Sequence, residues 1–439
     1  MRFYTGDEAG LVKAVHFVAP KAEAKPVSTK GKPKHDKLDK DNDQPEQRPV
    51  VQAWGSVDKI MGIQMMAWAS DKQIVVARNS GQIQYISTQT GSVVREYMHI
   101  HHPADATNVG ISPSLSKLEH FVGLHETEGT LISCTSHGRV IYDRISESET
   151  ALPSLAVSLG QDQLCRMRVS ASQPNIFVTG GKEREIAIWD INRAKESALQ
   201  PIWKSKNVKN DFLDLRVPVW NTDIQWCTPS DTTKFVVGTG HHQIRLYDTK
   251  AARRPVISKE VGEHPVRALA LAENGQEVIL SDTTDLMMSF DLRMQKVVAR
   301  YKGLDGCVTS NYACGNEKSV VSVSMDRHLR VHARTSKANL LKKVYLTQRL
   351  SAVLVDEEWV DESSTTKSTR DTQIGEGLSH RAKAAAVGDD GDDEDEDIWE
   401  RMKQVDEENE YDAEAPRPKK RKLLEKKVKR KTAFIVADK

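Results

Sequence analysis

The residues best suited to chemistry in this sequence do not form a catalytic set. The chain lacks the Gly-x-x-x-x-Gly-Lys-Ser/Thr loop of nucleotide sites, the Gly-x-Ser-x-Gly turn of serine hydrolases and the His-Glu-x-x-His pair of zinc proteases. Gly238 and Gly240 lack the third glycine of a dinucleotide loop. His99, His101 and His102 form the densest histidine cluster, but no cysteine or carboxylate lies at a metal-site spacing from it. We expect no enzyme, no cofactor and no metal.

One run of mixed residues has the composition of a binding surface. It reads Asp-Leu-Arg-Val-Pro-Val-Trp over residues 214–220. Arg and Trp are over-represented where proteins bind one another, and proline lacks a backbone donor. We therefore select Asp214, Arg216 and Trp220 as partner-docking candidates. The alternative is that the apolar residues of the run only pack in the interior, which leaves Asp214 and Arg216 unexplained.

Basic residues are a second group of candidates. Lys182, Arg245 and Arg327 complete the set of docking candidates. Several loop cations have the charge to meet nucleic-acid phosphate, namely Lys182, Arg184, Lys204, Lys206, Lys209, Arg253, Arg254 and Arg327. The net charge of residues 1–360 is only +5, however, so we expect protein contacts to supply most of the affinity. The alternative for these lysines is simple solvation.

The last segment, 361–439, is predicted to be a disordered charged tail. It holds 21 acids and 17 bases, with eight acids in 389–397 and ten bases in 417–431. An extended cationic peptide of this density suits capture by an importin, so we expect nuclear import. The residues concerned are Lys419, Lys420, Arg421, Lys422, Lys426, Lys427, Lys429, Arg430 and Lys431.

Between the acidic and basic runs, four apolar residues share one helical stripe. Ile398, Trp399, Met402 and Val405 fall at positions i, i+1, i+4 and i+7. We hypothesise a recognition helix that folds when it binds a partner. The alternative is a disordered acidic linker that happens to contain a tryptophan.

The elements that must position these residues are short strands in a repeating unit. Six units end in an aromatic residue or its equivalent, and from Tyr85 these anchors recur at intervals of 57, 47, 58, 43 and 42 residues. The clearest copy contains four alternating strands within 266–303, which is one blade of a WD-type β-propeller. In such blades a turn Asp and a His before the first strand are buried and paired, so Asp326 and His264 are expected to be structural.

The strands at the two ends of residues 1–360 complete a seventh blade. Strands 2–6 and 11–18 at one end and 352–357 at the other are incomplete alone, and strand 50–55 supplies an outer edge. Closure from both ends removes exposed sheet edges. We predict an all-β, seven-bladed propeller over 1–360, closed by N- and C-terminal strands, with 20–49 as a disordered loop of the closing blade.

Composition excludes several classes of protein. The chain has 439 residues, 28% of them charged, with no apolar run long enough for a membrane helix and no signal-peptide core at the N-terminus. Its five cysteines include no Cys-x-x-Cys pair, which suits reduced thiols. We expect a soluble protein of the cytosol or nucleus with no membrane partner.

Four runs carry a resemblance to a known family. Residues 178–183, 210–220, 238–248 and 326–332 resemble the WD-repeat ribosome biogenesis factors of the Nsa-one / WD-repeat-containing protein seventy-four family. The resemblance implies a nucleolar assembly factor on pre-60S ribosomal particles, needed for large-subunit rRNA processing, released by an AAA-type ATPase and monomeric outside the particle. The rival interpretations are a propeller adaptor in a chromatin or ubiquitin-ligase complex, and a hydrolase with its residues in the central channel.

Overall fold

The computed structural model describes residues 1–18, 48–100, 119–144, 155–194, 198–210 and 213–360. The predicted tail, with its import run and its recognition helix, lies outside these residues. The same holds for the predicted loop 20–49, except for its last two residues. No helix in the described ranges is long and apolar enough to cross a membrane.

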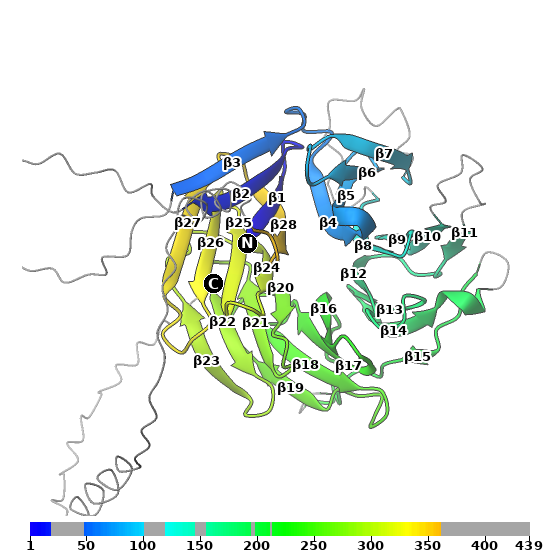
Figure 1. The fold of residues 1–439 in the computed structure, drawn as a ribbon. Helices are drawn as coiled ribbons and strands as arrows, with labels where there is room; N and C mark the ends of the chain where they lie inside the picture. The colour runs from blue at the N-terminus through cyan, green and yellow to red at the C-terminus, as the bar shows by residue number, and fades with distance from the viewer. Residues whose placement is uncertain (19–47, 101–118, 145–154, 195–197, 211–212, 361–439) are drawn as a thin grey trace, which may run out of the picture. The chain divides into compact units, whose positions relative to one another are not determined.

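Seven four-stranded antiparallel sheets form a ring (Figure 1). From the innermost strand outward, the closing blade is β28 (Leu350–Asp356), β1 (Arg2–Asp7), β2 (Val12–Val18) and β3 (Arg48–Trp54). Blade 1 is β4 (Ile63–Ala69), β5 (Gln73–Arg78), β6 (Gln82–Ser87) and β7 (Val93–Met98). Blade 2 is β8 (Phe121–Thr127), β9 (Thr130–Thr135), β10 (Arg139–Arg144) and β11 (Leu155–Ser158). Blade 3 is β12 (Leu164–Val169), β13 (Ile176–Gly181), β14 (Arg184–Asp190) and β15 (Trp203–Lys204).

The remaining three blades follow the same order. Blade 4 is β16 (Asn221–Thr228), β17 (Asp231–Thr239), β18 (Gln243–Asp248) and β19 (Ile257–Glu260). Blade 5 is β20 (Val266–Leu271), β21 (Glu277–Asp282), β22 (Met287–Asp291) and β23 (Lys296–Tyr301). Blade 6 is β24 (Val308–Ala313), β25 (Ser319–Ser324), β26 (His328–Ala333) and β27 (Leu340–Tyr345). Two short 3₁₀ turns, η1 (Ser70–Lys72) and η4 (Ile191–Arg193), join strands.

The predicted seven-bladed propeller and its mode of closure are confirmed. β28 pairs with β1, with Arg2 opposite Asp356, so both ends of the described chain share one sheet. The predicted loop 20–49 ends earlier than expected, because Arg48 and Pro49 pair with Val18 and Phe17. Pro49 is tolerated there because β3 is an edge strand, where a missing backbone donor costs little.

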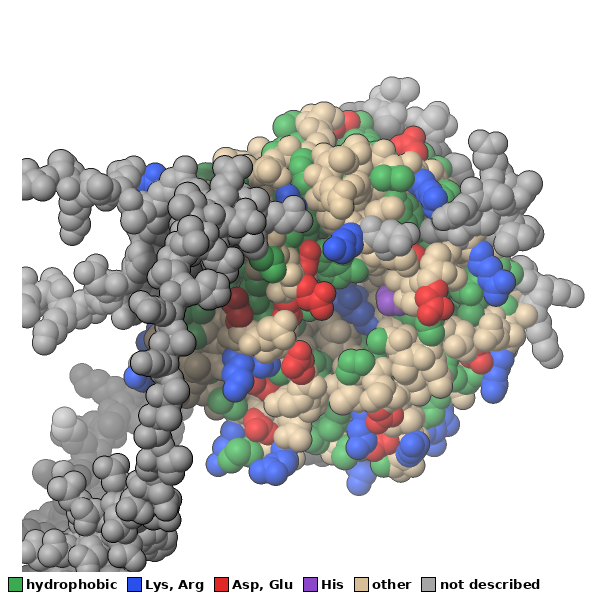
Figure 2. Space-filling model, in the orientation of Figure 1, with side chains coloured by type: hydrophobic (Ala, Val, Ile, Leu, Met, Phe, Trp, Pro, Cys, Tyr) green, Lys and Arg blue, Asp and Glu red, His purple; other side chains and the backbone are tan. Residues whose placement is uncertain are grey.

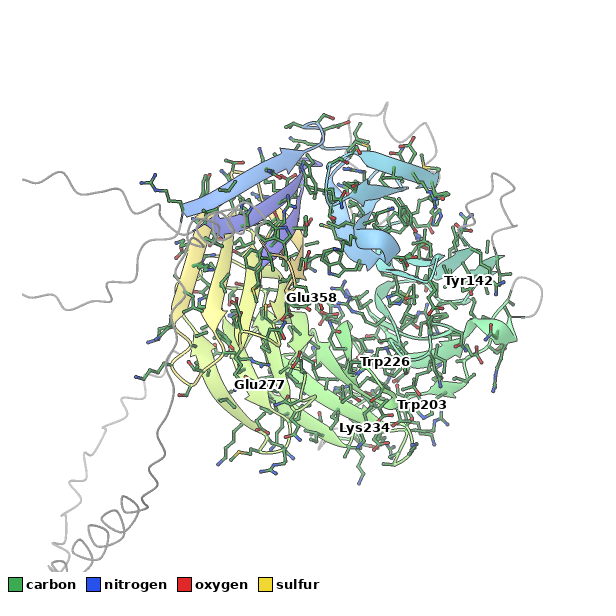
Figure 3. All side chains as sticks on the ribbon, in the orientation of Figure 1. Tyr142, Trp203, Trp226, Lys234, Glu277 and Glu358 are labelled. Atoms are coloured by element: carbon green, nitrogen blue, oxygen red, sulfur yellow. The ribbon has the colours of Figure 1, made fainter. Side chains whose placement is uncertain are left out.

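The core lies between neighbouring blades, where β-branched and aromatic residues of adjacent sheets interdigitate. Phe3 and Val15 of the closing blade, for example, pack with Val321 of blade 6. Trp226 of β16 and Trp203 of β15 both pack edge-on against Phe235, with ring centroids 5.6 and 5.9 Å away (Figure 3). Trp203 thereby joins blade 3 to blade 4, whereas Trp226 and Phe235 are neighbours within blade 4.

Antiparallel pairing divides the loops between two faces. The turns between second and third strands, and the connections from an outermost strand to the next blade, emerge at one end of the sheets, which we call the top face. The turns between first and second strands, and between third and fourth, emerge at the opposite end, the bottom face.

The turn aspartate of blade 6 is structural, as expected. Asp326 accepts hydrogen bonds from Ser324 and from the backbone N–H of His328, and lies 2.5 Å from the fully buried Arg330. Burial alone would raise the pKa of Asp326, but these hydrogen bonds outweigh it and hold the pKa well below its usual range. His264, in contrast, was wrongly expected to be buried, because it lies in an exposed connection on the top face.

His99 also has a structural role. Its imidazole is buried, with Nδ1 2.8 Å from the hydroxyl of Ser133 and Nε2 2.9 Å from the carboxylate of Asp143. His99 follows β7 of blade 1, whereas Ser133 and Asp143 belong to blade 2. The imidazole of His99 therefore links blade 1 to blade 2. Its neighbours His101 and His102 lie outside the described residues.

Candidate docking face

Most of the docking candidates lie on one face of the ring. Lys182 is in the turn between β13 and β14, and Asp214, Arg216 and Trp220 belong to the connection between β15 and β16. Both loops emerge on the top face, at adjacent blades. The structure therefore joins residues that are more than 30 positions apart in the sequence.

A contact between Trp220 and Lys182 forms the centre of this surface. The two residues make an isolated antiparallel bridge, and Lys182 Nζ lies 5.4 Å from the centroid of the Trp220 ring. A cation at this distance is attracted by the ring quadrupole, with about 0.5–1 kcal/mol at an exposed site. His241 packs edge-on against the same ring at 6.2 Å. The tryptophan is thus held half-buried between these neighbours.

Hydrogen bonds hold the connection between β15 and β16 in place. Asn207 donates through its side-chain amide to the carbonyl of Val217 at 2.6 Å, and Asn210 donates to the carboxylate of Asp214 at 2.9 Å. Asp214 has a positive φ of 59°, a left-handed conformation that Asp tolerates better than most residues. This turn leaves the side chains of Leu213 and Leu215 63% and 59% exposed.

Arg216 makes only a weak ion pair. Its guanidinium lies 3.8 Å from Glu183, and both side chains are more than half exposed. Exposed pairs contribute about 0–1 kcal/mol, so this one is easily exchanged for a partner's carboxylate or phosphate. We call Lys182, Leu213, Asp214, Leu215, Arg216 and Trp220 the docking patch.

The alternation within 214–220 explains part of the run but not all of it. Val219 is 2% exposed and packs inward, whereas Leu215 points out. The alternative of simple interior packing is therefore wrong for Leu215. Leu213 and the outward position of Leu215 were missed by the sequence analysis, although two leucines in an otherwise polar connection are themselves a signal of a binding surface.

Two candidates do not belong to the patch. Arg245 is 2% exposed, and its guanidinium donates to Gln243 Oε1 at 2.7 Å, so it is an interior residue and not a docking one. Arg327 is exposed on the top face, but it lies in blade 6 and donates to the hydroxyl of Tyr345 at 3.3 Å. The structure does not bring it near the docking patch.

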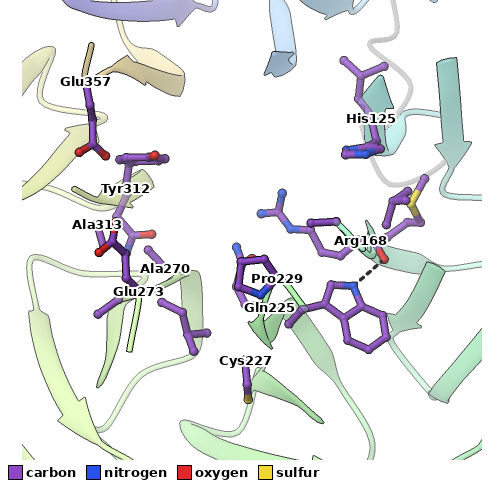
Figure 4. A pocket seen from close by; sticks show the side chains of 18 residues that line it. His125, Arg168, Gln225, Cys227, Pro229, Ala270, Glu273, Tyr312, Ala313 and Glu357 are labelled. Atoms are coloured by element: carbon purple, nitrogen blue, oxygen red, sulfur yellow. Dashed lines mark hydrogen bonds between the residues drawn. The ribbon is translucent and has the colours of Figure 1, made fainter. Parts of the chain in front are cut away.

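The bottom end of the central channel holds a cavity of about 410 Å³ (Figure 4). Figure 2 shows the centre of the ring as a hollow with acidic side chains beside it. The walls come from the innermost strands of several blades and include Arg168, Trp226, Tyr312 and Glu357. The cavity has the size of a ligand pocket, so its polar groups decide whether it has the parts of an active site.

One wall of the cavity is cationic and internally compensated. Asp223 is 1% exposed, and its carboxylate lies 2.8 Å from Arg166 and 3.7 Å from Arg168. The backbone N–H of Leu269 donates to the same carboxylate at 2.9 Å. Burial lowers the pKa of Arg168, and Asp223 opposes this shift. Asp223 of blade 4 thus binds two arginines of blade 3 and a backbone N–H of blade 5, and so links the three blades.

His125 and Tyr312 of the cavity are poor proton-transfer groups near neutral pH. Burial, helped by the charge of Arg168, lowers the pKa of His125 to about 4, so its imidazole is neutral. Burial and the charge of Glu357 raise the pKa of Tyr312 to about 12. Glu357 accepts hydrogen bonds from the backbone N–H groups of Gly315 and Asn316. These backbone hydrogen bonds hold the Glu357 carboxylate in place beside Tyr312.

Gly240 is required beside the docking patch, because a Cβ there would lie 2.2 Å from the ring of Trp220. We expect Gly240→Ala to displace Trp220 and lower the free energy of unfolding by about 1–3 kcal/mol, the usual cost of overpacking. Gly306→Ala is the control, since its Cβ would meet its nearest neighbour at 3.5 Å. Urea unfolding followed by tryptophan fluorescence compares the two. An equal free energy of unfolding for the two variants would contradict the close contact between Gly240 and the ring of Trp220.

Comparisons with known proteins give relatives for this chain. No protein-family model matches it. WD repeat-containing protein 74 of Bos taurus is 38% identical over 247 residues, and that of Homo sapiens is 37% identical over the same length. Ribosome biogenesis protein nsa1 of Schizosaccharomyces pombe is 24% identical in an alignment 446 positions long, which covers 96% of this chain and 99% of the relative.

The extent of these matches differs between animals and fungi. The mammalian alignments cover 55% of this chain and 62% of each relative. The chain therefore spans about three fifths of the mammalian relatives that it matches, and nearly all of the fission-yeast relative.

Proposed function

Since the chain is a homologue of WD repeat-containing protein 74 and of ribosome biogenesis protein NSA1, we propose that it is a non-enzymatic assembly factor of the large ribosomal subunit. It docks on nucleolar pre-60S particles and is needed for large-subunit rRNA processing. The docking patch on the top face is the observation that supports this role, because it combines exposed leucines, a half-buried tryptophan and an exchangeable arginine.

The mechanism is binding and exchange. Hydrogen bonds from Asn207 and Asn210 hold the connection that carries the patch, so less conformational entropy is lost on docking. On binding, Leu213 and Leu215 are removed from water, and Arg216 exchanges Glu183 for a group of the partner. Neighbouring assembly factors are the partners of this surface.

Release from the particle depends on an AAA-type ATPase. The sequence has no nucleotide-binding loop, so the energy for removal comes from outside the chain. The stripe of Ile398, Trp399, Met402 and Val405 is the segment that this ATPase or an assembly partner binds. These residues lie outside the described part of the chain, so this step rests on the sequence pattern alone.

The basic run in the tail is the nuclear-import signal read by an importin. We expect the protein to be no longer imported, and so to be absent from the nucleus and nucleolus, when six cations of this run are changed to Gln. These are Lys419, Lys420, Arg421, Lys422, Lys426 and Lys427. Fluorescence microscopy of the tagged protein measures the nuclear fraction. The control changes six other tail cations to Gln, namely Lys367, Arg370, Arg381, Lys383, Arg401 and Lys403. Equal nuclear accumulation of both variants would remove the assignment.

Affinity purification of the tagged full-length protein tests the proposed function. We expect it to recover large-subunit precursor RNA together with assembly factors. Recovery of histones or of ubiquitin-ligase subunits in place of that RNA would instead favour an adaptor role for the propeller.

A further inference from the structure

Seven basic side chains gather on the outer edge of blades 3 and 4. They come from two segments far apart in the sequence, 203–209 and 250–259, which contain seven Lys or Arg and no Asp or Glu. We call them the basic stripe: Lys204, Lys206, Lys209, Lys250, Arg253, Arg254 and Lys259. All seven are exposed. Figure 2 shows Lys and Arg side chains along the edge of the ring where β17, β18 and β19 lie in Figure 1.

Hydrogen bonds across the seam between the blades hold the two segments together. Arg253 donates through Nε to the carbonyl of Lys204 at 2.7 Å, and the backbone N–H of Lys206 donates to the carbonyl of Arg253 at 2.8 Å. Arg254 donates through Nε to the carbonyl of Asn207 at 3.1 Å. Each arginine is therefore fixed by one nitrogen, while its two terminal nitrogens remain available. The stripe is a built surface rather than a set of unrelated loop lysines.

No member of the stripe forms an ion pair with a described residue. The pKa of the nearby Asp231 carboxyl is lowered first by a hydrogen bond from the Thr233 side chain, although the charge of Lys250 also lowers it. Nearby Lys234, in contrast, lies 3.8 Å from Asp248 (Figure 3). Seven close cations repel one another, and a bound polyanion would remove that repulsion.

We propose that the basic stripe binds the phosphate backbone of ribosomal RNA, an inference that rests on the proposed function. Lysine is depleted at protein interfaces but binds phosphate well, and five of the seven cations are lysines. A protein partner would present charges of both signs, whereas RNA presents a uniform row of phosphates. The stripe contains only positive charges, so it matches RNA.

The contact is with phosphates and not with bases. Trp203 is the aromatic residue within the two segments, and its ring packs edge-on against Phe235 and Tyr247 in the interior. No aromatic face of these segments is therefore free to stack on an unpaired base. Binding at the stripe is independent of RNA sequence and strongly dependent on salt.

Salt-dependent binding of the full-length protein to RNA tests the stripe. The test variant is Lys204→Gln, Lys206→Gln and Lys209→Gln, because these side chains make no described contact that the fold needs. The probe is a short fluorescein-labelled RNA duplex of arbitrary sequence, followed by fluorescence anisotropy across a series of KCl concentrations. We expect the slope of log affinity against log salt to fall by about one for each lost phosphate contact, and the affinity to fall at least ~10-fold.

The matched control removes the same charge elsewhere. Lys296→Gln, Lys302→Gln and Lys337→Gln change three exposed lysines of blades 5 and 6. Because the basic tail run is intact in both triple variants, it contributes equally to both. We expect the control to keep the wild-type slope. A thermal melt of each variant confirms that both remain folded.

The outcomes separate the stripe from the proposed function. If the slope of log affinity against log salt is the same for the two triple variants, the stripe does not bind RNA phosphate. This holds whether or not the protein recovers precursor RNA from cells. A selective loss of slope in the test variant supports the stripe as a phosphate site. If the wild-type protein recovers no ribosomal RNA from cells, the proposed function fails and the ribosomal identity of the RNA fails with it.

Discussion

Asp326→Ala is expected to lower the free energy of unfolding by about 3–5 kcal/mol, because it leaves the charge of Arg330 buried with most of its compensation removed. The side chain of Arg330 is fully buried, and the Asp326 carboxylate is the nearest acid to it, at 2.5 Å. Arg330 NH1 also donates to Ser324 at 3.0 Å, so the three residues form one network in the turn of blade 6. Urea unfolding followed by tryptophan fluorescence measures the loss.

The structure offers a close control for this variant. Asp305 also approaches the guanidinium of Arg330, at 3.4 Å, but its side chain is 71% exposed. Asp305→Ala is expected to cost at most about 1 kcal/mol, as for other exposed ion pairs. Equal losses in the two variants would show that burial of the Asp326–Arg330 pair does not govern the stability of this blade.

The same network predicts a dependence on pH. The pKa of Asp326 is depressed in the folded protein, despite the opposing effect of burial, by hydrogen bonds from Arg330, Ser324 and the N–H of His328. Its contribution is therefore fully present above the unfolded-state pKa of about 4 and is lost as the pH falls below it. The difference in free energy of unfolding between the wild type and Asp326→Ala should therefore shrink as the pH is lowered from about 4 toward the depressed pKa of the folded state.

Reversing the charges of the docking patch is expected to have the largest effect on association with the particle. In the variant Asp214→Lys with Arg216→Glu, the exchangeable arginine becomes an acid beside Glu183. Substitutions at the centre of an interface commonly cost about 2 kcal/mol or more, a loss of affinity of roughly 30-fold. Quantitative recovery of large-subunit precursor RNA with the purified protein measures the effect.

Glu128→Lys with Arg293→Glu is the matched control. Both residues are exposed in turns of the bottom face, and the net charge is unchanged in both double variants. Glu128 has a positive φ of 50°, close to the 59° of Asp214, so the backbone strain on lysine is similar. We expect recovery of precursor RNA to be retained. Equal loss in both double variants would argue against the top face as the docking surface.

The blades could be predicted from the sequence because each one repeats a local pattern. Alternating apolar residues and turn signals define strands with little help from the rest of the fold. Closure by β28 and β1 was also predictable, because both ends of the propeller region were left with incomplete sets of strands. The limits of the strands could not be predicted in this way. Pro49 would normally end a strand, and only the position of β3 at an edge permits it there.

The exposure of individual cations could not be predicted in the same way. Arg245 lies on the third strand of its blade, as do the equally buried Lys13 and Arg330. Their burial is compensated by partners such as Asp7, 2.8 Å from Lys13, and these partners are brought near only when the sheets form. A basic residue in a strand therefore gives no indication, from sequence alone, of which way it points.

The docking patch shows the same limit for apolar residues. Leu213 and Leu215 would be assigned to a core by residue type alone. The left-handed turn at Asp214 and the anchoring of Val217 by Asn207 direct these leucines outward. Both effects depend on contacts within one irregular connection, and a periodic pattern in the sequence does not predict such contacts.

Sedimentation through a sucrose gradient tests the central claim, that the propeller docks on large-subunit precursors through its top face. The tagged protein from a nuclear extract is compared with the Asp214→Lys, Arg216→Glu variant and with a chain ending at Val360 that carries a foreign nuclear-import signal. The account predicts comigration of the wild-type and shortened proteins with large-subunit precursor RNA, and release of the double variant to the top of the gradient. A wild-type protein that stays at the top, free of ribosomal RNA, would contradict it.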